Sequence, residues 1–317
     1  MGAQRRTTAP PTGVRAYSSR PLDAPKPTPE RKKVTVNTIH RLHQKRTPIT
    51  VVTAYDYPTG MIVDRGQCDI CLVGDSFAMV ALGYESTASL TMDEMLHHCR
   101  ATARGCKKAF KVADLPMGTY QLSPEQALAS SFRVIKEGHM EAVKMEGGAE
   151  IAESVRRITQ AGIPVMGHIG LTPQHEHALG GFRVQGKTAK KAEKVLTDAL
   201  ALQAAGCFSL VIECVPGPVA AKITSLLNIP TIGIGAGPDT SGQVLVIQDM
   251  LGVFDRFMPK FCKIYGQFGT AMSQAIHQYV TEVQDRTFPD PQQHTYPMAS
   301  EEELEEWLRV IEHYKEK

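Results

Sequence analysis

The chain has 317 residues, of which 42% are hydrophobic and 21% are charged, and its formal net charge at pH 7 is +2. This composition is typical of a globular protein with a large core, and the near-neutral charge argues against nucleic acid as the main partner. No apolar stretch approaches the roughly 20 residues that a membrane-crossing helix needs. The seven cysteines are an odd number scattered along the chain, which favours reduced thiols over a disulfide framework.

The first 33 residues differ in composition from the rest. They contain eight lysines and arginines against only Asp23 and Glu30, and residues 1–22 carry four arginines and no acid. Arg-rich, Ser-containing and acid-poor segments are typical of mitochondrial transit peptides. The string VRAYSS (14–19) also resembles sites cut by the matrix processing peptidase. We therefore expect residues 1–33 to direct the protein to the mitochondrial matrix; the alternative is a disordered basic tail.

Beyond residue 33, short apolar runs alternate with stretches long enough for a helix, a pattern typical of buried parallel strands in βα units. Seven such runs are present: ITVVTAYDY (49–57), ICLVGDS (70–76), AFKVADLP (109–116), EAVKMEGG (141–148), PVMGHIG (164–170), SLVIECVP (209–216) and IPTIGIGAG (229–237). The eighth strand is the weakest, and we place it near residues 254–258. Residues 34–286 have the size of one such domain, about 250 residues, so we predict a single-domain α/β (β/α)8 TIM barrel.

Capping residues mark helix starts several positions beyond the strand ends. Thr91 and Glu94 form a capping box, in which the hydroxyl and the carboxylate each accept from a free backbone N–H. Similar starts are predicted at Ser123-Pro124, Thr172-Pro173 and Thr240 with Gln243.

Residues 287–317 are predicted to form a linker and then an amphipathic helix that Ser300 and Glu303 cap. The apolar stripe of this helix has helical spacing and consists of Leu304, Trp307, Leu308 and Ile311. We expect it to dock on the barrel or on a neighbouring subunit.

Most of the apolar runs end in a group that can do chemistry. The strands of a (β/α)8 barrel place their C-terminal ends around one active site. We therefore expect the following side chains to converge: Asp75, Asp114, Lys144, Glu146, His168 and Glu213. Carboxylates and a lysine around one mouth indicate a metal-assisted enzyme.

Asp75 and Asp114 suit Mg2+, which usually binds one or two carboxylates and completes its shell with substrate and water; the alternative is helix capping at two βα turns. Lys144 and Glu146 point to the same side of a strand because side chains alternate. Lys144 can neutralise a substrate oxygen and Glu146 can hold a metal-bound water; the alternative is a structural ion pair. Glu213 follows apolar residues, and desolvation favours its action as a base; a buried glutamate with a backbone partner is the alternative.

Other motifs carry less weight. His168 is either a proton shuttle or orienting group or a satisfied histidine at the rim, and its spacing to His175 and His177 does not favour zinc. Cys68 and Cys71 have CxxC spacing but run into a strand, so we interpret them as strand-filling residues. In the glycine-rich segment 233–237, the third glycine of GxGxxG is replaced by proline, which indicates a loop that a ligand can approach closely rather than a dinucleotide site.

At these residues the sequence resembles the ketopantoate hydroxymethyltransferase family. The matching strings run in family order over roughly residues 35–286: TAYDY (53–57), LVGDS (72–76), ADLP (113–116), VKMEGG (143–148), GHIGLTPQ (167–174), VQGK (184–187), ALALQAAG (199–206), IECVP (212–216) and IGIGAG (232–237). Phe77, Ala78 and Met145 depart from bacterial members, which tend to carry Leu, Gly and Ile there, but none of these positions is charged.

The resemblance implies a (β/α)8 barrel that catalyses the first committed step of pantothenate synthesis. The substrates would be 3-methyl-2-oxobutanoate and 5,10-methylenetetrahydrofolate, with Mg2+ as the metal. By motif position, Asp75 and Asp114 carry over as metal ligands that also contact the keto acid, and Glu146 as a ligand directly or through water. Ser76 and Lys144 carry over as keto-acid contacts beside His168, and Glu213 as the base. Family members form large homo-oligomers, decamers in bacteria.

Three other functions are alternatives to this one. A nucleic-acid binder that uses the basic N-terminus is disfavoured by the near-neutral charge of the rest of the chain. A Mg2+-dependent C–C lyase or mutase of the phosphoenolpyruvate mutase and isocitrate lyase type would carry a reactive cysteine in a basic KKCGH-type string, which this chain lacks. A catalytically inactive barrel that serves as a scaffold would have lost some of the acidic residues, and all of them are present.

Overall fold

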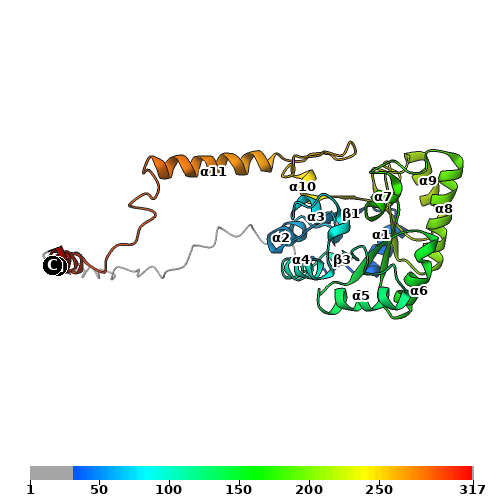
Figure 1. The fold of residues 1–317 in the computed structure, drawn as a ribbon, viewed down its shortest axis with the longest axis horizontal. Helices are drawn as coiled ribbons and strands as arrows, with labels where there is room; N and C mark the ends of the chain where they lie inside the picture. Colours follow the sequence, from blue (N-terminus) through cyan, green and yellow to red (C-terminus); the bar gives the residue numbers. More distant parts are fainter. Residues whose placement is uncertain (1–30, 316–317) are drawn as a thin grey trace, which may run out of the picture. The chain divides into compact units, whose positions relative to one another are not determined.

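The structure, a computed structural model, describes residues 31–315, so the expected transit peptide lies almost wholly outside the described residues. Eight parallel strands close into a barrel in the order of the sequence, which confirms the predicted (β/α)8 fold (Figure 1). The strands are β1 (Ile49–Thr53), β2 (Ile70–Val73), β3 (Phe110–Asp114), β4 (Ala142–Glu146), β5 (Val165–Gly170), β6 (Ser209–Glu213), β7 (Thr231–Ile234) and β8 (Gly242–Leu245). The barrel closes where Val51 of β1 pairs with Val244 of β8.

The predicted position of the eighth strand is wrong. Residues 254–258 lie in a loop, and β8 occupies Gly242–Leu245, where a helix start was predicted around Thr240. The segment 235–241 between β7 and β8 contains no helix, so the expected alternation of strand and helix breaks down there. Gly242 explains the weak apolar signal, because a Cβ at this position would lie 2.2 Å from the carbonyl oxygen of Ile49 on the neighbouring strand.

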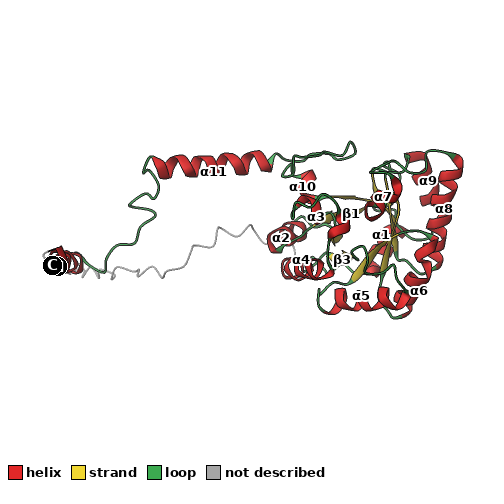
Figure 2. Ribbon diagram, in the orientation of Figure 1, coloured by secondary structure: helices red, strands yellow, loops and turns green. Residues whose placement is uncertain are grey.

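Helices surround the strands (Figure 2). The α-helices are α1 (Val36–Gln44), α2 (Tyr57–Arg65), α3 (Phe77–Val80), α4 (Met92–Gly105), α5 (Pro124–Lys136), α6 (Ala152–Gln160), α7 (Glu176–Leu179), α8 (Ala189–Ala204), α9 (Gly217–Leu226), α10 (Ile247–Met250), α11 (Phe268–Gln284) and α12 (Glu301–Lys315). The capping box of Thr91 and Glu94 is confirmed, and the Ser123 side chain caps α5. Thr172 precedes only a short 3-10 helix, Pro173–His175, and makes no side-chain cap. None of the helices in residues 31–315 has the length and apolarity to cross a bilayer.

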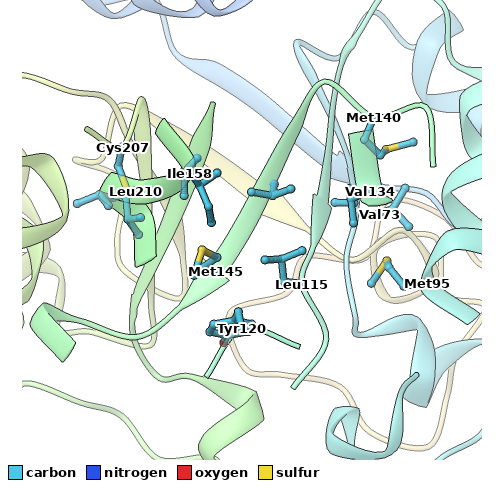
Figure 3. Packing of buried hydrophobic residues seen from close by; sticks show 14 of the residues in the cluster. Val73, Met95, Leu115, Tyr120, Val134, Met140, Met145, Ile158, Cys207 and Leu210 are labelled. Carbon is cyan, nitrogen blue, oxygen red and sulfur yellow. The ribbon is translucent and has the colours of Figure 1, made fainter. Parts of the chain in front are cut away.

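The hydrophobic core has two parts. The larger part packs the outer face of the strands against the helices, and Figure 3 shows a portion of it around Met145, Ile158 and Leu210. The smaller part fills the barrel with buried strand residues that include Val112, Met166 and Val211. Side chains two positions apart on a strand point to the same side. The inward positions that follow these three residues are Asp114, His168 and Glu213. The alternation of the strands therefore aims the polar groups into the C-terminal mouth.

The helices after β8 expose apolar side chains. No residue of α11 is buried, and its exposed residues include Met272, Ile276, Tyr279, Val280 and Val283. The predicted C-terminal helix is present as α12, but Leu304, Trp307 and Leu308 of its stripe stay 43%, 52% and 52% exposed. The described chain therefore does not cover this stripe, and docking on a neighbouring subunit stays a prediction.

Candidate active site

The six charged residues singled out from the sequence lie at the C-terminal ends of five neighbouring strands. Asp75 follows β2, Asp114 ends β3, Lys144 and Glu146 lie on β4, His168 on β5, and Glu213 ends β6. Five of these side chains are at most 5% exposed, whereas that of Glu213 is 14% exposed. The structure therefore brings the predicted residues together in one buried cluster, with Glu213 at its more open side.

Lys144 and Asp114 form a buried ion pair, with Nζ 2.7 Å from Oδ1. The second oxygen of Asp114 accepts a hydrogen bond of 2.9 Å from the backbone N–H of Asp75, and Glu146 lies 3.9 Å from Nζ on the same strand. Burial by itself lowers the pKa of Lys144, but the carboxylates of Asp114, Glu146 and Asp75 raise it above its usual value. The lysine therefore holds a fixed positive charge inside the site.

His168 stands between two carboxylates. Its Nδ1 lies 3.3 Å from Oε1 of Glu146, and its Nε2 lies 3.2 Å from Oε2 of Glu213. Neither contact is an aligned hydrogen bond. Burial and Lys144 lower the pKa of His168, but Glu146 and Glu213 outweigh them and raise it to about 9. Burial raises the pKa of Glu146, yet His168 and Lys144 bring it below its usual value. The pair is therefore charged at neutral pH.

Asp75 is a carboxyl whose negative form is disfavoured in this cluster. Burial and the neighbouring carboxylates of Asp114 and Glu146 raise its pKa well above the usual range. A bound cation would relieve this repulsion. No three His, Cys, Asp or Glu side chains within residues 31–315 are arranged to hold a metal ion by themselves. Mg2+, however, usually takes only one or two carboxylates and fills its shell with water and substrate oxygens. The pair of Asp75 and Asp114 fits that requirement.

Gln174 and Tyr120 support the cluster, and sequence reasoning missed both. The amide of Gln174 donates to Oδ2 of Asp75 at 2.8 Å and to the carbonyl of Leu115 at 2.9 Å, while its backbone N–H donates to Oε2 of Glu146 at 3.0 Å. The Tyr120 hydroxyl lies 2.7 Å from the Gln174 amide oxygen and 3.0 Å from the Glu146 carbonyl. One uncharged residue after β5 thus orients carboxylates from β2 and β4. Its only signal in the sequence was its place in the string GHIGLTPQ.

Ser76 and Asp249 lie toward β1 and β8. The hydroxyl of Ser76 is 2.8 Å from that of the buried Tyr55. Asp249 belongs to α10, directly after β8, and is only 8% exposed. Its Oδ1 has no hydrogen-bond partner in the part of the chain that the structure describes, and burial raises its pKa to about 6. Sequence reasoning missed Asp249 because it looked for the eighth strand further along the chain.

The remaining motifs lie in or beside β2, at the surface and in the loop after β7. Cys71 is buried in β2, and Cys68, which precedes the strand, is partly buried. His177 is 85% exposed, away from any metal-binding arrangement among the described residues. In the glycine-rich loop after β7, Gly235 has φ +62°, and a Cβ there would lie 2.7 Å from the ring of Phe261. This loop and Phe261 line a cavity of about 400 Å³.

Residues 33–291 match the family described as ketopantoate hydroxymethyltransferase. The chain is 52% identical over 308 residues to 3-methyl-2-oxobutanoate hydroxymethyltransferase of Emericella nidulans, a match that covers 96% of this chain and 87% of the relative. It is 53% identical over 274 residues to 3-methyl-2-oxobutanoate hydroxymethyltransferase 2, mitochondrial, of Oryza sativa subsp. japonica. This match covers 85% of this chain and 69% of the relative.

Solved structures show a likeness of fold alone. Phosphonopyruvate hydrolase in complex with oxalate and Mg++ superimposes with a TM-score of 0.54 at 13% identity and covers 90% of this chain and all of that one. For 2,3-dimethylmalate lyase, a member of the PEP mutase/isocitrate lyase superfamily, the TM-score is 0.52 at 11% identity. The superposition covers 87% of this chain and 98% of the lyase.

Proposed function

The chain belongs to the ketopantoate hydroxymethyltransferase family, and from this premise we propose that it transfers a hydroxymethyl group from 5,10-methylenetetrahydrofolate to 3-methyl-2-oxobutanoate. The products are 2-dehydropantoate (ketopantoate) and tetrahydrofolate, and the reaction opens pantothenate synthesis. The observation that carries the proposal is the buried cluster at the barrel mouth, in which a fixed ammonium and paired carboxylates lie beside a more open glutamate.

Asp75 and Asp114 are the proposed ligands of Mg2+, with Glu146 as a ligand directly or through water. The ion, when bound, supplies Lewis-acid polarisation of the α-keto acid. Gln174 fixes two of these carboxylates, and supporting groups of this kind typically change metal affinity 10–100-fold when they are removed. Gln174 is therefore as much a part of the proposed metal site as the ligands are.

Lys144 and Ser76 are the proposed contacts to the keto acid. The ammonium of Lys144 stays protonated between Asp114 and Glu146, so it can stabilise negative charge that develops on the keto oxygen. The hydroxyl of Ser76 is oriented by Tyr55 and can donate to a substrate oxygen. Both groups are in place before the substrate arrives, which limits reorganisation during the reaction.

Glu213 is the proposed base that removes the proton from C3 of the keto acid. His168 lies 3.2 Å from its carboxylate and is protonated at neutral pH, so it orients the base and cannot easily act as one itself. The carbon that has lost its proton accepts the one-carbon unit of the donor, and tetrahydrofolate leaves. Water supplies the oxygen of the new hydroxyl group, which balances the reaction.

An assay of ketopantoate formation tests this function, with the keto acid, methylenetetrahydrofolate and Mg2+ each omitted in turn. Each omission should abolish product formation. Cleavage of 2,3-dimethylmalate or phosphonopyruvate in the absence of the folate would instead favour the lyase or mutase alternative, whose support here is a likeness of fold.

Two further properties are proposed with the function. We propose that the enzyme is a homo-oligomer, because α11 and α12 expose apolar side chains that the described chain does not cover; bacterial-type decamers set the expected size. We also propose that it resides in the mitochondrial matrix, since plant relatives are named mitochondrial and residues 1–33 have the composition of a transit peptide.

A further inference from the structure

We propose that a second pocket, formed by residues 178–191, binds the aryl-glutamate tail of the one-carbon donor. This inference rests on the proposed function and assigns part of the donor site. The pocket has a volume of about 610 Å³, within the usual range for small-molecule sites. Its lining residues come from α7, the following loop and the start of α8: Ala178, Leu179, Phe182, Arg183, Val184, Gln185, Lys187 and Lys191.

The walls of the pocket combine apolar surface with positive charge. Phe182 and Val184 are 50% and 44% exposed, so they offer an aromatic and an aliphatic face to a ligand. The cations are Arg183, Lys187 and Lys191, and no acidic residue lines the pocket. None of the three forms an ion pair within residues 31–315, whereas Lys194, one turn further along α8, pairs with Asp198 at 2.5 Å. The three charges are therefore available to an anionic ligand.

The pocket is joined to the strand end that carries the proposed base. The backbone N–H of Gln185 donates a hydrogen bond of 2.8 Å to the carbonyl of Cys214, the residue after Glu213. Gly186 packs beside Val215, whose Cγ1 would lie 3.5 Å from an added Cβ. The loop that lines the pocket is therefore anchored to the strand end that carries Glu213, the most exposed acid of the cluster.

The chemistry of the pocket fits the donor better than the keto acid. The keto acid is small, and its oxygens are served by Mg2+, Lys144 and Ser76 in the proposed site. The donor has an aromatic ring in its side chain, followed by a glutamate that carries two carboxylates, and each added glutamate contributes one more. An apolar wall beside three unpaired cations matches an aryl group followed by a row of carboxylates. The pocket should therefore discriminate donors by the length of the tail.

Steady-state kinetics with monoglutamyl and pentaglutamyl methylenetetrahydrofolate test the proposal. We expect the double variant Lys187→Gln/Lys191→Gln to raise KM for the pentaglutamyl donor about tenfold and KM for the monoglutamyl donor less than threefold. The turnover number at saturating donor and KM for the keto acid should stay within twofold. Added salt should reduce the preference of the wild type for the long tail, because the charges are exposed and screened. Phe182→Ala should weaken both donors alike.

Lys194→Gln is the matched control, since this lysine lies on the same helix but is already paired. Equal effects of Lys194→Gln and of the double variant would overturn the proposal in favour of general electrostatic attraction. So would an unchanged KM for the pentaglutamyl donor in the double variant.

Exchange of the C3 proton of the keto acid, measured without any donor, separates this inference from the proposed function. The double variant should exchange at the wild-type rate because its keto-acid site is intact. A wild-type enzyme that neither exchanges this proton nor forms product refutes the function itself. If the double variant exchanges the proton normally but no longer distinguishes the pentaglutamyl from the monoglutamyl donor, the proposed role of the pocket is supported.

Discussion

Replacing Glu213 with glutamine removes the proposed base while the shape of the side chain is retained. The carboxylate is 14% exposed and its nearest charged partner is His168, so an amide of the same size should fit without repacking. Asp75, Asp114 and Lys144 contact one another and Gln174 rather than Glu213. The variant should therefore fold normally and retain its affinity for Mg2+.

The expected loss follows from the groups that remain. Removal of a general base typically lowers the rate by ~10²–10⁴-fold, which corresponds to about 3–5 kcal/mol in activation free energy. His168 could replace the base only as neutral imidazole. Its pKa of about 9 is raised by Glu146 and Glu213, and Glu146 remains in the variant. His168 should therefore stay largely protonated near pH 7, and we expect no efficient substitute base.

The most direct assay follows exchange of the C3 proton of 3-methyl-2-oxobutanoate with D2O by NMR, with Mg2+ but without the donor. Wild-type enzyme should exchange this proton, because enolisation needs only the metal site and the base, and Glu213→Gln should not. Glu141→Gln is the control, since Glu141 is also ion-paired and partly buried but precedes β4 at the opposite end of the barrel. Exchange at the wild-type rate in Glu213→Gln would refute the assignment and make His168 the next residue to test.

Four further predictions follow from the site, α10 and the N-terminus. Gln174→Leu should weaken Mg2+ binding ~10–100-fold, measured by calorimetry without substrate; unchanged affinity would show that Asp75 and Glu146 need no support from Gln174. EDTA should abolish turnover and Mg2+ should restore it, so full activity in metal-free buffer would contradict the metal assignment. Asp249 has a pKa raised from 3.8 to about 6, so its contribution to stability is present below pH ~4 and is lost as pH rises through 6. Asp249→Asn should therefore raise the free energy of unfolding at pH 8 by up to ~3 kcal/mol and have little effect near pH 4; urea denaturation that shows no such difference would contradict it. Deletion of residues 1–33 should leave activity in vitro intact and keep the protein in the cytosol, and import of the truncated protein into mitochondria would disprove the targeting role.

The site residues at the strand ends could be predicted because each is a polar group at the end of an apolar run, where core packing alone would not place it. Asp114, Lys144 and Glu213 were found in this way, and the barrel topology alone then places them together. The eighth strand could not be found by the same rule. This strand has only four residues, and its two inward positions are Gly242 and Val244. In addition, no helix separates it from β7.

The contacts between site residues could not be predicted from the sequence, because they depend on the register between neighbouring strands. Glu146 and His168 are direct neighbours in the pairing of β4 with β5, which is why one histidine bridges two glutamates. Gln174 and Tyr120 are uncharged; Tyr120 lies in a loop and Gln174 in a single 3-10 turn, where no periodicity marks them. Their role depends on hydrogen bonds between segments far apart in the chain, such as the bond that joins Gln174 to Asp75.

The exposed apolar side chains of α11 have a thermodynamic consequence. A helix without a buried residue gains little from tertiary packing within its own chain, and packing is the main source of helix stability in proteins. With a second copy covering Met272, Ile276 and Tyr279, as the proposed oligomer requires, the free energy of unfolding includes a contribution from mass action and rises with protein concentration. The melting temperature of the enzyme then depends on the protein concentration as well as on the sequence. Dilution would therefore leave free subunits less stable than assembled ones.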